Sequence, residues 1–305
     1  MKKSIILLTL LFLLSGCTIT NLMAKGRTNK KITILEQISL EYPTKNGIDF
    51  FGISDLAYDT KNSKLYMIGD RSTFYTFSAK FDKKIKDLKY LSSYKIKNSK
   101  EKSNYDSEGL TFNNKNELII SFEGQAKIAN ISKRGKVMKS HTLPKKLRPK
   151  ANYKSKNKML ESIAYHSKYG ILTASEYPLK KSKKNFQTIY SLKGQEWYFK
   201  MEKHPNSAIT ALEVMDDNNI LVLERAYNGY SKPMFISLKK VYLNKCNVKR
   251  ECKSELLASF SSDEGYGYNN FEGLAKVGKN RYLMISDNNG HDILPTTLTY
   301  FRVKP

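Results

Sequence analysis

The sequence predicts an all-β fold, a single β-propeller of four-stranded blades. Five segments share one pattern, and their first positions lie at residues 54, 108, 161, 210 and 272, which gives spacings of 54, 53, 49 and 62. Each segment is followed by a short polar turn and by an apolar run that ends in an acidic residue. Long stretches of helical periodicity are absent. Repeats of about 40 to 50 residues that each hold several short strands are typical of β-propellers.

The repeat count favours five blades, and six would need one divergent unit within the longer linkers. Each unit offers third and fourth strand-like runs, such as Phe74–Phe77 and Leu88–Lys95 in the first. The last unit lacks its own fourth strand. We expect Ile32–Ile38 to supply that strand, which would close the ring and remove an open sheet edge.

The N-terminus has the pattern of a bacterial lipoprotein signal. Lys2 and Lys3 precede an apolar run, Ile5–Leu14, which is too short to span a bilayer and is followed by Ser15-Gly16-Cys17. We therefore expect a signal peptide at residues 1–16, a lipidated Cys17, a tether through residue 31 and a propeller domain over residues 32–305. An ordinary secretory signal with a chance cysteine is the alternative.

A lipid-bearing Cys17 would place the protein in the cell envelope with the membrane as its partner. Thr18, rather than Asp, follows the cysteine, which favours an outer-membrane location facing the periplasm. Two cysteines remain in the body of the chain, Cys246 and Cys252, and an oxidising compartment predicts a disulfide between them.

The composition is strongly basic. The chain of 305 residues has 53 Lys and Arg against 28 Asp and Glu, a formal net charge of +25. For an exported, lipid-anchored protein we interpret this charge as a generally basic surface, and no nucleic-acid partner is expected. The hydrophobic fraction of 40 % excludes a disordered chain.

Acidic residues recur at two positions of each repeat. Because neighbouring strands run antiparallel, the start of the first strand and the end of the second lie at the same end of a blade. The first position holds three glutamates, Glu108, Glu161 and Glu272, with Ser54 and Asp55 in the first repeat. The second position holds Asp70, Glu123, Glu176, Glu224 and Asp287. These acids should converge at one mouth of the central channel.

Three interpretations of this acidic mouth stay open. Carboxylates are the ligands that Ca²⁺ prefers, so the mouth could hold Ca²⁺ as a cofactor. In that case the metal ligands would be Asp55, Asp70, Glu123, Glu176, Glu224 and Asp287, and the catalytic residues would be Glu108, Glu161 and Glu272. Alternatively, Arg71 and Arg225 could pair with the acids in a purely structural ring, or the mouth could be a polar well that binds substrate through Arg71, Arg225 and Asn288.

The repeated Glu-Gly-Leu units, each followed by a strand that ends in Ser-Phe-Glu-Gly, Ala-Ser-Glu or Ile-Ser-Asp-Asn, resemble the phytase-like family of exported bacterial proteins, also described as "esterase-like activity of phytase". The segments Tyr105–Leu110, Leu160–Ala164 and Asn270–Leu274 match best, and the resemblance covers about Phe51–Val303. It implies a β-propeller whose recurrent acids serve a phosphoesterase. Thr210, which replaces the first acid of the fourth repeat, departs from this pattern.

Two classes of function follow. The first is a Ca²⁺-dependent hydrolase of phosphate esters that gathers an anionic, phosphorylated small molecule with the basic loops around the mouth. The second is a non-catalytic propeller lipoprotein that binds a ligand or a protein, and a metal-dependent lactonase is a minor alternative. The sequence has no G-x-S-x-G, H-E-x-x-H or P-loop motif, which argues against the enzyme classes that these motifs define.

Overall fold

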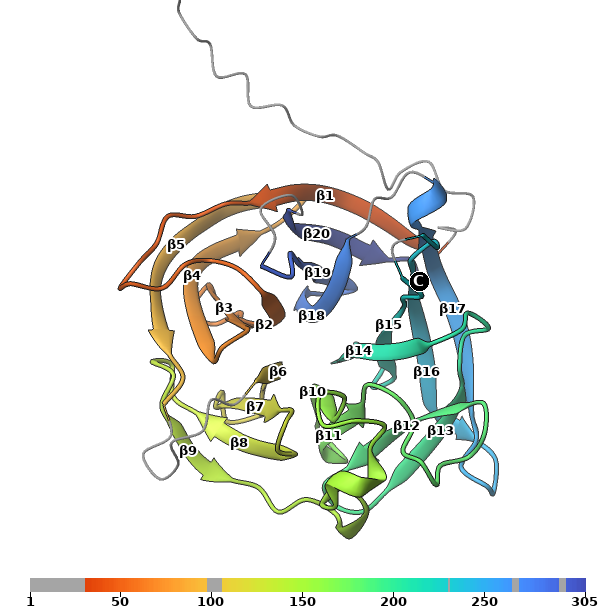
Figure 1. The fold of residues 1–305 in the computed structure, drawn as a ribbon. Helices are drawn as coiled ribbons and strands as arrows, with labels where there is room; N and C mark the ends of the chain where they lie inside the picture. The colour runs from red at the N-terminus through yellow and green to blue at the C-terminus, as the bar shows by residue number, and fades with distance from the viewer. Residues whose placement is uncertain (1–30, 98–105, 230, 265–268, 291–294) are drawn as a thin grey trace, which may run out of the picture.

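The computed structural model describes residues 31–97, 106–229, 231–264, 269–290 and 295–305. Five four-stranded antiparallel sheets surround a central axis like the blades of a propeller (Figure 1). The predicted all-β fold with five blades is confirmed. The predicted signal peptide at 1–16, Cys17 and the tether up to residue 30 lie outside the described residues.

Each of the first four blades consists of four consecutive strands. Blade one is formed by β2 (Ile53–Asp59), β3 (Lys64–Gly69), β4 (Thr73–Phe81) and β5 (Ile85–Lys95). Blade two is formed by β6 (Ser107–Phe112), β7 (Leu118–Phe122), β8 (Lys127–Ile131) and β9 (Val137–Ser140). Blade three is formed by β10 (Leu160–His166), β11 (Gly170–Ser175), β12 (Phe186–Ser191) and β13 (Glu196–Lys200). Blade four is formed by β14 (Ser207–Val214), β15 (Ile220–Ala226), β16 (Phe235–Cys246) and β17 (Cys252–Ser261).

The fifth blade joins the two ends of the chain. It is formed by β18 (Asn270–Gly278), β19 (Arg281–Asp287), β20 (Thr296–Val303) and the N-terminal strand β1 (Ile32–Leu40). Strand β1 pairs antiparallel with β20 along its whole length, from Ile32 opposite Val303 to Leu40 opposite Thr296. The predicted closure of the ring by the N-terminal strand is confirmed.

The hydrophobic core lies between the blades. Five apolar clusters each combine residues from two neighbouring sheets, so that one cluster fills each of the five interfaces around the ring. The second strand of each blade therefore has both faces covered. In β7 all five residues are buried, which explains why these strands are continuous apolar runs rather than alternating ones.

The longest hairpin, β16–β17, extends beyond the core of blade four. Cys246 and Cys252 are joined by a disulfide bond near its tip. The tip contacts blade three, where the Tyr198 amide donates a hydrogen bond to the Arg250 carbonyl at 2.9 Å. The hairpin thereby covers part of β13, the outer edge strand of the neighbouring sheet.

Helical structure in these described ranges consists of three short 3₁₀ turns, at Lys145–Leu147, Lys150–Asn152 and Ser262–Glu264. None of these helices is long and apolar enough to cross a membrane.

Candidate functional site

Every inner strand of the propeller carries a β-bulge at the same place. The pairing with the second strand skips one residue in each blade, and these five residues are Ser54, Glu108, Glu161, Thr210 and Glu272. A bulge leaves its extra residue outside the ladder and redirects the side chain. The first acidic position predicted from the repeat is therefore the bulge residue of each inner strand.

The second acidic position lies at the end of the second strand of each blade. It is the residue that follows the pairing partner of the inner-strand residue just before the bulge. In four blades this position holds an acid, and in blade four it holds an arginine: Asp70, Glu123, Glu176, Arg225 and Asp287. Ile209 pairs with Glu224, so Glu224 lies one residue earlier than its supposed equivalents. The repeat register is thus predicted correctly in four blades and is off by one in blade four.

The prediction that Glu224 belongs to the acidic mouth is wrong. A shift of one residue along a strand turns the side chain to the opposite face. The Glu224 carboxylate lies 3.0 Å from Nζ of Lys239, which is itself 3 % exposed and also contacts Glu202 at 2.8 Å. Burial raises the pKa of Glu224 to about 7, while the charge of Lys239 opposes that shift.

Asp55 also has a role different from the predicted one. Its side chain is buried, and its two carboxylate oxygens accept hydrogen bonds from the amides of Leu110 at 2.7 Å and of Leu274 at 3.0 Å. Asp55 therefore links blade one to both of its neighbours in the ring, blades two and five. Gly273 permits this approach, since a Cβ there would lie 2.8 Å from Cα of Asp55. These bonds give Asp55 a part in holding the blades together.

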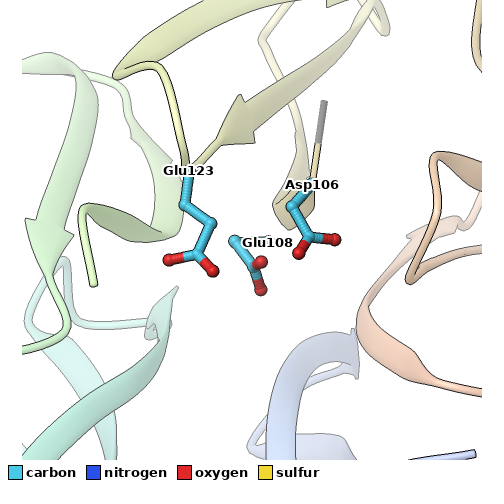
Figure 2. Close-up of side chains that lie close together, drawn as sticks. All are labelled: Asp106, Glu108 and Glu123. Atoms are coloured by element: carbon cyan, nitrogen blue, oxygen red, sulfur yellow. The ribbon is translucent and has the colours of Figure 1, made fainter. Parts of the chain in front are cut away.

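Three carboxylates from blade two gather at one side of the mouth. Asp106, Glu108 and Glu123 each offer an oxygen, and these oxygens lie within 4.8 Å of one another (Figure 2). The Glu123 amide donates a hydrogen bond to the Asp106 carbonyl at 3.0 Å, which holds the two segments together. Sequence reasoning missed Asp106. Its position two residues before Glu108, at the entry to the inner strand, was the available signal.

The three carboxylates raise one another's pKa. Burial is the largest cause for Glu108, followed by the charges of Glu161, Glu123 and Asp106. Burial and then the charges of Asp106 and Glu176 raise the pKa of Glu123 to about 8. Burial also raises the pKa of Asp106. Charged carboxylates this close repel each other, so the cluster favours either protons or a bound cation.

Glu161 reaches into the same mouth from blade three. Its side chain is 7 % exposed, and no hydrogen bond or ion pair to its carboxylate occurs within the described ranges of the chain. Burial, and then the charges of Glu176, Glu272 and Glu123, raise its pKa well above the usual value. A buried carboxylate that has no such partner and faces other acids is costly unless a proton or cation compensates it.

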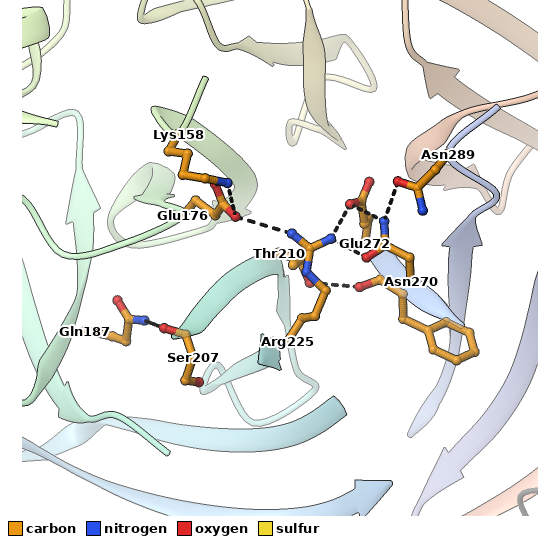
Figure 3. Close-up of polar contacts among 10 residues, drawn as sticks. Lys158, Glu176, Gln187, Ser207, Thr210, Arg225, Asn270, Glu272 and Asn289 are labelled. Carbon is orange, nitrogen blue, oxygen red and sulfur yellow. Dashed lines mark hydrogen bonds and ion pairs between the residues drawn. The ribbon is translucent and has the colours of Figure 1, made fainter. Parts of the chain in front are cut away.

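The opposite side of the mouth carries its own positive charge. Arg225 donates hydrogen bonds to Glu272 at 2.6 Å and to Glu176 at 3.2 Å, and it also contacts the side-chain oxygen of Asn270 (Figure 3). Lys158 lies 2.9 and 2.8 Å from the two oxygens of Glu176. The charges of Glu272 and Glu176 raise the pKa of Arg225, although burial opposes its charged form.

Blades one and five complete the mouth. Burial, followed by the charges of Asp106 and Glu272, raises the pKa of Asp70 to about 7. Burial, followed by the charges of Glu272 and Asp70, raises the pKa of Asp287 to about 8.

Two of the residues predicted to bind substrate lie at the edge of this mouth. The Arg71 guanidinium lies 5.3 Å from the centre of the Phe51 ring, and its charge lowers the pKa of Asp70. The side-chain oxygen of Asn288 accepts hydrogen bonds from the amides of Gly52 at 2.9 Å and of Gly290 at 3.2 Å. Asn288 therefore fastens two loop segments.

A basic loop borders the three-carboxylate cluster. The Gly124 amide, next to Glu123, donates to the Lys156 carbonyl at 3.1 Å. In the same loop, Nζ of Lys154 lies 3.7 Å from the centre of the Tyr177 ring, and Lys158 approaches the same ring at 5.2 Å. Of these two lysines, Lys158 acts on the cluster, since its charge opposes the rise in the pKa of Glu123.

The charges of the mouth do not balance. Its acids are linked by mutual electrostatic effects and number eight in the described ranges: Asp70, Asp106, Glu108, Glu123, Glu161, Glu176, Glu272 and Asp287. Arg225 and Lys158 form ion pairs with Glu272 and Glu176, and Arg71 lies near Asp70. Oxygen-only donor sets with surplus negative charge fit a hard cation such as Ca²⁺.

Fold and mouth together define a five-bladed propeller with an acidic channel entrance. The family model of phytase-like proteins, described as esterase-like activity of phytase, matches residues 48–290. The chain therefore belongs to the phytase-like family, as its repeated motifs predicted. No curated protein matches the chain.

Several solved structures are similar to the chain at low identity. They include the PQQ-bound aldose sugar dehydrogenase of Streptomyces coelicolor, at 8 % identity and a TM-score of 0.42, covering 90 % of this chain and 98 % of that one. A luciferin-regenerating enzyme has 10 % identity and a TM-score of 0.43, with 84 % and 93 % covered. Virginiamycin B lyase of Staphylococcus aureus has 9 % identity and a TM-score of 0.40, with 90 % and 100 % covered. Likenesses at this level say nothing about activity.

Proposed function

We propose that the protein is a Ca²⁺-dependent hydrolase of phosphate esters that acts at the acidic mouth. One observation carries the proposal. Three carboxylates, from Asp106, Glu108 and Glu123, lie within 4.8 Å of one another with surplus negative charge and with lysines on the adjoining loop. A hard cation would satisfy the carboxylates, and the lysines would attract the anionic substrate.

Each residue of the mouth has a distinct part in this proposal. Asp106, Glu108 and Glu123 would hold the cation, so Glu108 changes from a predicted catalytic acid to a ligand. When bound, Ca²⁺ would polarise a phosphoryl oxygen and lower the pKa of a water molecule. Glu161, whose carboxylate has no hydrogen-bond or ion-pair partner among the described residues, would accept a proton from that water in its ionised form, and its raised pKa would make it a stronger base. Lys154 would bind the negative phosphoryl oxygens.

The third predicted catalytic residue, Glu272, has a supporting part. Its ion pair with Arg225 at 2.6 Å engages its carboxylate and holds the guanidinium in place. Arg225 can still direct further N–H groups toward an anionic ligand.

A paired set of variants tests the proposal. Glu123→Gln should weaken the Ca²⁺-induced rise in melting temperature and lower phosphomonoester hydrolysis together, because it removes a ligand. Glu161→Gln should lower the hydrolysis rate and leave the Ca²⁺ response largely intact. Glu117→Gln, an exposed acid in a turn between β6 and β7, is the matched control and should change neither. Wild-type protein that shows no Ca²⁺ response and no hydrolysis across a panel of phosphomonoesters would refute this function.

A non-catalytic binding propeller is the second candidate, and one observation favours it. Blade four contributes no carboxylate to the mouth, because Thr210 and Arg225 occupy its two positions. A chain that binds a phosphorylated ligand tightly in the presence of Ca²⁺, yet releases no phosphate from it, would support this candidate.

We also propose that the mature protein is a lipoprotein anchored through Cys17 in the outer membrane and facing the periplasm. The support is the sequence pattern of a basic start, a short apolar run and Ser-Gly-Cys. Cys17→Ala should abolish processing and detergent partitioning. If processing and partitioning of the variant match those of the wild type, the lipid anchor is excluded.

A further inference from the structure

The five blades allow each mouth position to be compared within one chain. At the second acidic position, which ends the second strand of each blade, four blades have an acid and blade four has Arg225. The bulge position of the same blade is Thr210, whose hydroxyl donates to the Phe271 carbonyl at 3.2 Å. Blade four therefore has no carboxylate at either mouth position and carries a positive charge at one of them.

The side chain of Arg225 joins the two blades that flank its own. One nitrogen contacts Glu272 of blade five at 2.6 Å, and the other contacts Glu176 of blade three at 3.2 Å. The guanidinium is 14 % exposed, and Glu176 is 2 % exposed. Figure 3 shows the guanidinium between the two carboxylates. It thus occupies a place within reach of two carboxylates, where a cation would otherwise be held.

We propose that Arg225 is a built-in counter-cation that takes the place of a metal ion in one half of the mouth. For the other half of the mouth, the inference rests on the proposed function, in which Asp106, Glu108 and Glu123 hold a cation. Arg225 and Lys158 neutralise Glu272 and Glu176, whereas that cluster keeps its surplus charge. The wild-type mouth should therefore hold one divalent cation, on the side of blade two.

Removal of the guanidinium should create a second cation site. In Arg225→Gln, Glu272 would lose its ion-pair partner, Glu176 would keep only Lys158, and Glu161 would face both. Glu161 lies near the other two carboxylates and near Arg225, since the charges of all three affect its pKa. The three carboxylates would therefore surround the vacated space. Breaking a buried ion pair leaves an uncompensated charge and is strongly destabilising, so a divalent ion at that place should restore stability.

Calorimetric titration of the purified mature chain with CaCl₂ tests the proposal. We expect one Ca²⁺ per wild-type chain and two per Arg225→Gln chain. The melting temperature of Arg225→Gln without Ca²⁺ should fall by about 10 °C, and excess Ca²⁺ should recover most of that loss. Arg225→Lys keeps the charge and should retain the wild-type stoichiometry.

Lys239→Gln is the matched control. It removes a buried cation from the same sheet, beside Glu224 and away from the mouth. It should lower the melting temperature without raising the Ca²⁺ stoichiometry, and Ca²⁺ should not restore the loss.

The outcomes separate this inference from the proposed function. A wild-type chain that binds no Ca²⁺, with an Arg225→Gln chain that binds one, would refute the metal-dependent function and support the role of Arg225. Equal stoichiometry in both chains, with no recovery of stability by Ca²⁺, would overturn the role of Arg225. If Arg225→Gln fails to fold without Ca²⁺, refolding in CaCl₂ decides: recovery of the native fold supports the inference, and failure to recover it overturns the inference.

Discussion

Removal of the buried Asp55 side chain should destabilise the propeller at the contact between three blades. Its carboxylate accepts two buried backbone hydrogen bonds, at 2.7 Å from blade two and at 3.0 Å from blade five. Asp55→Ala would leave both amides without an acceptor, and each orphaned amide costs about 1–3 kcal/mol. The expected loss in the free energy of unfolding is therefore about 2–6 kcal/mol, which at about 2 °C per kcal/mol lowers the melting temperature of a chain of this size by roughly 4–12 °C.

The measurement is urea unfolding followed by the circular dichroism of the β-sheet signal, with thermal melts alongside. Asp55→Asn keeps one acceptor oxygen and turns an NH₂ group toward the other amide, so its loss should be close to that of the alanine variant. Asp87→Ala, on the exposed face of β5, is the control and should lie within about 0.5 kcal/mol of wild type. A loss below about 1 kcal/mol for Asp55→Ala would show that the blades do not depend on this link.

Three further predictions concern the mouth, the disulfide and the axis. The raised pKa values of Glu123 and Asp287, both about 8, mean that the folded Ca²⁺-free protein holds protons that the unfolded chain releases near pH 4. The stability of the Ca²⁺-free protein should therefore fall as pH rises from about 4 to 8, and Asp287 alone should account for about 2 kcal/mol of this loss between pH 6 and 8. The Ca²⁺-induced rise in melting temperature should be larger at pH 8 than at pH 6. A Ca²⁺-free stability that is flat over this range in thermal melts would contradict the assignment. Replacing Cys246 and Cys252 with Ser should lower the free energy of unfolding in urea by about 2 kcal/mol and expose the β16–β17 tip to trypsin. If the double variant resists trypsin as well as the wild type does, the contacts with blade three alone hold the tip. Gly273→Ala should destabilise the fold in thermal melts, because its Cβ would meet the Asp55 backbone at 2.8 Å, and an unchanged melting temperature would mean that the axis can widen.

Much of the fold could be predicted because the physical signals of a propeller are local. The second strand of each blade is covered on both faces, so runs such as Leu118–Phe122 are apolar throughout, and short polar turns separate them from the inner strands. The repeat spacing predicted the number of blades. The absence of a fourth strand in the last repeat predicted that the N-terminal strand closes the ring. The repeat pattern does not reveal that β16 extends to Cys246, because the tip of that hairpin contacts the neighbouring blade three.

The site was harder to predict because its register depends on pairing between strands. A β-bulge shifts the facing of every later residue by one, and the sequence does not show where the bulge lies. Choosing by residue type alone selected the acid Glu224, although the pairing of Ile209 with Glu224 gives the mouth position to Arg225. Asp55, which lies one residue beyond the bulge of blade one, was included for the same reason. Its bonds to the neighbouring blades become visible only once the ring is closed.

The departures of blade four from the repeat have a common physical reason. Eight carboxylates around one axis already exceed the positive charge that two or three basic side chains supply, so a further acid at position 210 or 225 would add to the repulsion. Arg225 reduces that repulsion and also ties blade three to blade five, which a carboxylate at the same place could do only through a bound metal ion. An asymmetric ring of this kind neutralises Glu176 and Glu272 and leaves surplus charge on the side of Asp106, Glu108 and Glu123. That side is also the one bordered by the lysine-rich loop, so cation and anionic substrate would meet at the same edge of the mouth.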